Sequence, residues 1–122
     1  FMPTAEEIAT CEWLPDDELA FYAAEYSRTG FQGGLNWYRG RLDAALTAGL
    51  RLFSGRTIDV PSIFISGEKD WGVYQSPGAV EAMQERVCPR MSGVHLLPGA
   101  GHWVQQEQSA AVVAHVTQLL AS

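Results

Sequence analysis

Two side chains in this sequence have the types and the spacing that proton transfer requires. Asp70 lies three residues after Gly67, and His102 directly follows Gly101. A carboxylate beside an imidazole orients the ring and stabilises its protonated form, which is what a general base requires. Each residue taken alone is more often solvated or structural, so the argument depends on whether the fold brings the two together.

The residues between the acid and the histidine correspond to one strand–helix–strand unit. The apolar run Asp59–Gly67 predicts a buried strand, and Val94–Leu97 predicts a second one. A strand, a crossover helix and another strand normally form a parallel pair, and sites in such sheets lie beyond the carboxyl ends of the strands. We therefore expect the loops that carry Asp70 and His102 to lie side by side.

Apolar periodicity and helix-end signals predict four helices. They run from Asp16 to about Ser27, from Leu35 to about Leu50, from an N-cap at Ser76 to Pro89, and from about Ser109 onward. Gly30 ends the first, the pair Gly33–Gly34 makes a break before the second, and the first fifteen residues are expected to be loop. His95 then lies in a strand and His115 on the last helix, where we expect structural or surface roles.

Composition and charge restrict the function classes. The 122 residues are 47% hydrophobic and 18% charged, which is typical of one small globular domain. A net charge of −6 argues against nucleic acid, and no apolar run approaches the ~20 residues of a membrane helix. No secretory signal begins the sequence, so a cytoplasmic location is expected.

Cys11 and Cys88 form no CxxC pair, which favours two reduced thiols over a disulfide and argues against a zinc site.

Three stretches of the sequence carry a family resemblance. FQGGLNWYR at Phe31–Arg39, VPSIFISGEKDWG and GAGHWVQQEQ together resemble the C-terminal half of soluble epoxide hydrolases, and the resemblance runs from about Asp16 onward. It implies an α/β fold, namely the C-terminal portion of an α/β-hydrolase. Residues 1–55 would be the end of a helical lid, and residues 56–122 the last two parallel strands and helices of the core. The order acid then histidine is also that of α/β-hydrolases.

The resemblance implies a role for three residues. Asp70 is the acid that supports the histidine, and His102 is the base that activates water. Tyr38 is one of two lid tyrosines that hold the epoxide oxygen and protonate it. This role is chemically reasonable, because a phenol stays protonated at neutral pH and can donate to a developing alkoxide. Without the resemblance, Tyr38 would be interpreted as a core aromatic on a helix face.

Tryptophans are the expected substrate-binding residues. The resemblance implies that Trp37 and Trp103 form walls of the pocket. Trp71 is a further candidate, although a packing role is equally compatible with its position. Neither a metal nor a cofactor is expected, and the expected ligand is a small-molecule epoxide.

The carboxylate nucleophile of the family has no counterpart in this sequence. In the family, an aspartate at a strand-to-helix elbow attacks an epoxide carbon and forms a covalent ester. The other aspartates precede a strand or stand at helix starts or faces: Asp16, Asp17, Asp43 and Asp59. We therefore expect the chain to be part of a longer hydrolase, with the missing N-terminal half as its partner and with no turnover by itself.

Two other interpretations stay open. A haloalkane or haloacid dehalogenase would share the acid and the histidine but would use halide-binding groups where Tyr38 acts. A non-catalytic truncated fragment would self-associate, because two strands are too few for an independent sheet and leave an exposed edge. Both strands are expected to be buried on both faces in the complete fold, so the isolated chain would expose apolar surface.

Overall fold

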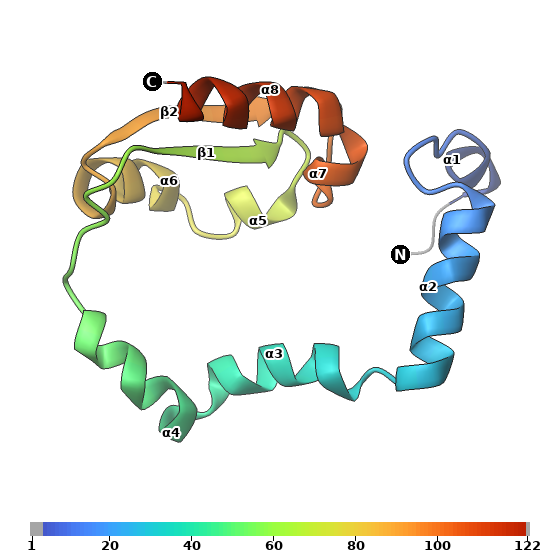
Figure 1. Cartoon of the computed structure of the whole chain (residues 1–122), viewed down its shortest axis with the longest axis horizontal. Helices are drawn as coiled ribbons and strands as arrows, with labels where there is room; N and C mark the ends of the chain where they lie inside the picture. The colour runs from blue at the N-terminus through green and yellow to red at the C-terminus, as the bar shows by residue number, and fades with distance from the viewer. Residues whose placement is uncertain (1–3, 122) are drawn as a thin grey trace. The chain divides into compact units, whose positions relative to one another are not determined.

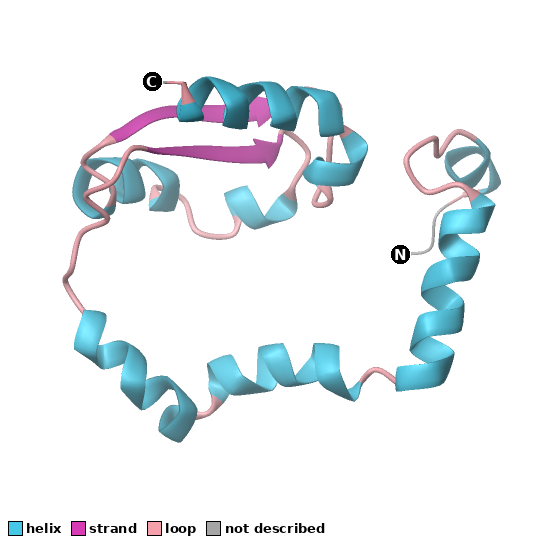
Figure 2. Cartoon of the chain, viewed as in Figure 1, coloured by secondary structure: helices cyan, strands magenta, loops and turns pink. Residues whose placement is uncertain are grey.

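The computed structural model of the chain describes residues 4–121. The chain divides into two compact units, Phe1–Ser54 and Gly55–Ser122. The first unit is helical, and the second combines helices with a two-stranded parallel sheet (Figure 1; Figure 2). Within the described residues, no helix has both the length and the apolar character needed to cross a membrane.

The first unit begins with helix α1 (Ala5–Ala9), where the sequence predicted only loop. A capping box explains this correction: the Thr4 hydroxyl accepts from the Glu7 amide at 3.2 Å, and the Glu7 carboxylate accepts from the Thr4 amide at 2.8 Å. Helix α2 (Asp16–Thr29) follows and ends at Gly30, which has φ 69°, as predicted.

The single helix expected from Leu35 to Leu50 is in fact two helices and a 3₁₀ turn. They are α3 (Gln32–Leu42), α4 (Ala44–Thr47) and the 3₁₀ segment Ala48–Phe53. Asp43 separates α3 from α4, because its backbone is extended and its carboxylate accepts from the Ala45 amide at 2.8 Å. The Gly33–Gly34 pair lies inside α3, so the expected break at these glycines is wrong.

The helices of the first unit form no core of their own. Between residues 4 and 54 no side chain is buried, and the face of α2 that periodicity predicted to be buried is exposed, with Leu19 at 51%. The ring of Tyr26 stacks on that of Phe31, with centroids 4.6 Å apart. This contact joins the end of α2 to the start of α3.

The second unit contains the predicted parallel pair of strands. Strands β1 (Ser62–Gly67) and β2 (Met91–Leu97) are parallel, with Phe64 opposite Val94. The helices are α5 (Trp71–Tyr74), α6 (Ala79–Ala82), which continues as a π-helical turn over Met83–Val87, α7 (Val104–Glu107) and α8 (Ser109–Leu120). Helix α8 runs along the sheet and contacts β1 (Figure 1).

One helix start in this unit differs from the prediction, and two short helices, α5 and α7, were not predicted. The crossover helix begins after Gly78, which has φ 81°, and not at Ser76 and Pro77. A glycine adopts this left-handed conformation without a Cβ penalty, so the chain can turn sharply into the helix there. The short helix α7 was not predicted, because it lies in the turn region that precedes the strong periodicity of α8.

The core of the second unit lies at the carboxyl ends of the strands. Leu97, Ala100 and Val104 are buried together, and Ile65 and Val112 pack against them. Along β1 only Ser66 and Gly67 are buried, and along β2 only Leu97, so the strands are mostly half-buried and not covered on both faces. Helices α7 and α8 contact β1 and provide the cover that this unit has.

Candidate active site

The loops that follow β1 and β2 are hydrogen-bonded to each other through their backbones. The Glu68 amide donates to the Leu97 carbonyl at 3.0 Å, and the Lys69 amide donates to the Ala100 carbonyl at 2.9 Å. Gly67 allows this approach, since a Cβ at that position would overlap the backbone of Ala100. The two loops are thereby held together where the strands end.

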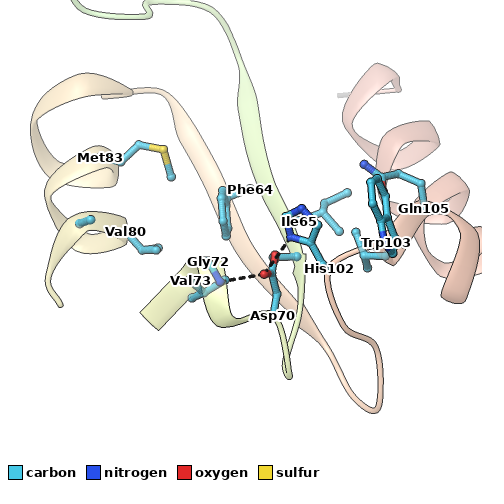
Figure 3. A pocket seen from close by; sticks show the side chains of 13 residues that line it. Phe64, Ile65, Asp70, Gly72, Val73, Val80, Met83, His102, Trp103 and Gln105 are labelled. Atoms are coloured by element: carbon cyan, nitrogen blue, oxygen red, sulfur yellow. Dashed lines mark hydrogen bonds and ion pairs between the residues drawn. The ribbon is translucent and has the colours of Figure 1, made fainter. Parts of the chain in front are cut away.

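Asp70 and His102 meet between these loops. Asp70 Oδ1 lies 3.0 Å from His102 Nδ1, as the parallel strand order predicts (Figure 3). Asp70 is also the N-cap of α5, because the same Oδ1 accepts from the Gly72 amide at 2.8 Å. The Ser66 hydroxyl donates to Asp70 Oδ2 at 2.9 Å, so both carboxylate oxygens have partners.

The environment of Asp70 favours its ionised form. Asp70 is buried, at 8% exposure, and this burial raises the pKa of its carboxyl group. Hydrogen bonds from the Gly72 amide, His102 and Ser66 outweigh the burial and hold the pKa of Asp70 below its ordinary value. An ionised carboxylate accepts the Nδ1 proton, which leaves Nε2 of His102 free to accept a proton.

Two tryptophan rings contact the imidazole of His102. The Trp71 ring stacks nearly parallel to it, with centroids 5.4 Å apart and planes at 19°. The Trp103 ring meets it edge-on at 5.2 Å and 74°. The His102 side chain is still 46% exposed, so the ring is held by contacts on several sides and remains open to solvent. Trp71 therefore packs against the histidine itself.

An open cavity of about 530 Å³ lies beside the pair. Its lining is largely apolar and includes Phe64, Val73, Val80 and Met83. Figure 3 shows Phe64, Val80 and Met83 on one side of the Asp70–His102 pair and Trp103 on the other. Trp103 thus lies in the wall of this cavity, where a substrate-binding residue was expected.

The other expected site residues lie on α3, in the first unit. Trp37 and Tyr38 are both exposed, and Tyr38 at 63% is not a core residue of its unit. Their assigned roles in the substrate pocket and at the epoxide oxygen stay predictions. The fold does confirm that both are on a helix ahead of the strands.

Sequence reasoning missed two polar side chains that support the pair. Ser66 is buried at the end of β1 and donates to Asp70. Glu107 ends α7 and accepts from the backbone amides of Gly101 and Trp103, on either side of His102. A hydroxyl beside the last glycine of a strand and an acid within about one turn after a candidate histidine are the signals that could have indicated them.

Two histidines, His95 and His115, and two cysteines, Cys11 and Cys88, remain. The rings of His95 on β2 and His115 on α8 stack with centroids 3.9 Å apart, which fits the structural roles expected for them. Cys11 and Cys88 are free thiols. In the part of the chain that the structure describes, no three His, Cys, Asp or Glu side chains gather as a metal site would require.

The relatives that the chain matches are epoxide hydrolases. The chain matches no family model. It is 40% identical over 112 residues to epoxide hydrolase A of Mycobacterium tuberculosis, covering 88% of this chain and 32% of that protein. The chain is homologous to epoxide hydrolases. Epoxide hydrolase 1 of Siraitia grosvenorii is 35% identical over 114 residues, which cover 89% of this chain and 35% of that protein.

Solved epoxide hydrolases share the fold. Epoxide hydrolase I of potato (Solanum tuberosum) superposes with a TM-score of 0.77 at 31% identity, over 99% of this chain and 41% of that structure. A laboratory-evolved variant of potato epoxide hydrolase superposes with a TM-score of 0.79 at 34% identity, over 98% of this chain and 38% of that structure. The predicted fold class, a portion of an α/β-hydrolase fold, is confirmed. The chain spans about a third of the length of the epoxide hydrolases it matches.

Proposed function

We propose that this chain supplies the acid–histidine pair of an epoxide hydrolase, which converts epoxides to vicinal diols. The observation that supports this most strongly is the contact of Asp70 Oδ1 with His102 Nδ1 at the carboxyl ends of two parallel strands. Homology to epoxide hydrolases over most of the chain gives the pair its chemical context.

The first step of the proposed reaction forms a covalent ester. A carboxylate from a segment outside this chain attacks one carbon of the epoxide, and the bond from that carbon to the ring oxygen breaks. The resulting alkoxide takes the phenolic proton of Tyr38, which leaves a tyrosinate. Trp37 and Trp103 would border the substrate, with residues 1–55 acting as the end of the lid.

The second step hydrolyses the ester. His102 Nε2 takes a proton from water, and the hydroxide adds to the carbonyl carbon of the ester. The bond to the alcohol oxygen then breaks, the acid proton moves to that oxygen, and the carboxylate and the diol are released. The imidazolium proton returns through solvent to the tyrosinate, so one water is consumed in each cycle. Ionised Asp70 stabilises the imidazolium.

The proposal requires a partner that completes the sheet and supplies the nucleophile. Two strands form less than a stable sheet, and about three or more are needed. The half-buried strands and the exposed apolar side chains of both units are surfaces that such a partner would cover. The partner would therefore correspond to the two-thirds of the related enzymes that this chain does not match.

The test is complementation. The chain is co-expressed with the portion of the M. tuberculosis relative that it does not match, and diol formation from styrene oxide is measured. His102→Gln, with His115→Gln as the matched control, should stop diol formation and leave an adduct of the mass of the epoxide on the partner. An active wild-type complex whose His102→Gln variant forms no adduct would exclude His102 as the water-activating base.

The same samples distinguish the non-catalytic alternative. Light scattering and native mass spectrometry give the particle mass, against 13.4 kDa for the chain alone. A one-to-one complex that produces diol supports the enzyme. A homo-oligomer that never binds the complementary portion and produces no diol supports a self-associating fragment instead.

A further inference from the structure

We infer that Glu107 is the positioning residue for His102, a role that rests on the proposed function of that histidine. Glu107 Oε2 accepts from the Gly101 amide at 2.6 Å, and Glu107 Oε1 accepts from the Trp103 amide at 2.9 Å. These two amides immediately precede and follow His102. One carboxylate therefore accepts hydrogen bonds from the backbone on both sides of the histidine.

The local structure explains why a carboxylate is needed at this point. The N-cap of α7, Trp103, has no side-chain cap hydrogen bond, and the first amides of a helix have no partner within it. Glu107 reaches back from the last residue of the same helix to accept from Trp103. Gly101 leaves space for the carboxylate, because a Cβ there would stand 3.3 Å from Glu107 Oε1.

Both carboxylate oxygens are used, and this makes the group specific. Hydrogen bonds to an ionised acceptor are shorter and stronger than neutral ones, and two oxygens on two amides fix an orientation as well as a distance. A glutamine offers one acceptor oxygen and one amino group, which cannot accept. Glu107→Gln must therefore leave one of the two amides, at Gly101 or Trp103, without its acceptor.

The turn held by Glu107 determines where the imidazole lies. The side chain of His102 is half exposed, and its one hydrogen bond to a protein group in the described site is to Asp70 at 3.0 Å. Displacement of a reacting group by a fraction of an ångström is costly, since about 1 Å can reduce a rate by ~10²-fold. The oxygens of Glu107 are engaged by backbone amides, so its effect acts through the position of His102.

The first experiment uses NMR of the 122-residue chain, isotope-labelled and bound to the complementary portion of the relative, and needs no turnover. Glu107→Gln should speed amide hydrogen exchange at Gly101 and Trp103 by about tenfold and weaken the low-field signal of the His102 Nδ1 proton. The amide of Ile65 in the sheet should be unchanged, and Glu85→Gln, an exposed glutamate of the same unit, is the matched control. An unchanged Nδ1 signal in Glu107→Gln would overturn the inference.

Gly101→Ala provides a second variant if Glu107→Gln loses the fold, which faster exchange at Ile65 would reveal. The added Cβ crowds Glu107 Oε1 while the carboxylate and its charge remain. The same Nδ1 signal should weaken, and the Trp103 amide should exchange faster. An Nδ1 signal of wild-type strength in this variant would overturn the inference as well.

The second experiment separates this inference from the proposed function. In the complemented wild-type enzyme, single-turnover kinetics resolve formation of the ester from its decay. Glu107→Gln should slow the decay between about tenfold and a hundredfold and leave formation unchanged, whereas general misfolding would slow both. If the ester decays in Glu107→Gln at the wild-type rate, the inference is wrong. A wild-type complex with no turnover sinks the proposed function, and the Nδ1 signal alone then decides the role of Glu107.

Discussion

Substituting asparagine for Asp70 would separate the charge of the acid from its shape. The asparagine would retain an acceptor oxygen for the Gly72 amide and for His102, and its amino group can donate to the Ser66 hydroxyl, which in wild type donates to Asp70 Oδ2. The hydrogen bonds are thus replaced and not deleted. What the substitution removes is the negative charge beside the imidazole.

The expected magnitude follows from the distance between the two groups. Oδ1 lies 3.0 Å from Nδ1, and a unit charge pair at that separation is worth about 5 kcal/mol at an effective dielectric constant of ~20. The His102 side chain is 46% exposed, and solvent screening reduces this by about half, to ~2.5 kcal/mol. Since each 1.36 kcal/mol is a factor of ten, the imidazolium-forming step should slow by about 10²-fold.

Single-turnover kinetics of the complemented enzyme would test this value. Ester formation requires no imidazolium and should keep its wild-type rate in Asp70→Asn, while ester decay should slow by about 10²-fold. Asp59→Asn, at an exposed aspartate of the same unit, is the matched control. Equal slowing of both steps, or no slowing of decay, would refute the assignment of Asp70 as the charge that stabilises the imidazolium.

Three further predictions concern the proposed proton donor Tyr38, the contact of the two loops, and pH. Tyr38→Phe should slow ester formation by about 10²-fold or more and spare ester decay; an equal effect on both rates would argue against proton donation. Gly67→Ala should lower the unfolding midpoint far more than Gly34→Ala, at a helical glycine with open space, because a Cβ at position 67 overlaps the backbone of Ala100; equal midpoints would contradict this packing. Folding lowers the pKa of Asp70 from its ordinary value of 3.8, so the stability that this carboxylate contributes is present above that pH and is lost as pH falls through the folded pKa. The unfolding midpoint of wild type in thermal scans should therefore fall more steeply on acidification than that of Asp70→Asn.

The acid–histidine contact could be predicted from sequence because it depends on one topological rule. Two apolar runs separated by a helix predict parallel strands, and the carboxyl ends of parallel strands share an edge. The residue types after Gly67 and Gly101 were then sufficient to place Asp70 and His102 together. The order of the elements carried this information, and no side-chain packing had to be known.

The supporting residues and several boundaries depend on local hydrogen bonds that periodicity does not report. Asp43 divides an apolar pattern that is continuous on either side, and Gly78 sets the start of α6 through its backbone conformation. Glu107 acts on amides four and six residues earlier, in a turn whose path cannot be read from residue types. These features require the conformation of the turn before the contact can be anticipated.

Burial was the least predictable property. The spacing of Leu19, Tyr22 and Tyr26 predicts that these side chains share a face of α2, and the helix places them on one face. Periodicity does not state what covers a face, and within the first unit these side chains are exposed. The strands show the same limit, since their apolar residues are half-buried except at the carboxyl ends.

The backbone hydrogen bonds between the loops after β1 and β2 have a consequence for how the proposed enzyme can diversify. Because the Glu68 amide donates to Leu97 and the Lys69 amide donates to Ala100, the two loops that carry Asp70 and His102, the proposed acid and base, are joined by main-chain hydrogen bonds. Side chains near these loops, such as those of Val80 and Met83 in the cavity wall, can change in size without altering the distance between Asp70 and His102. Selectivity for one substrate over another can therefore evolve separately from proton transfer, with the same two loops serving pockets of quite different shape.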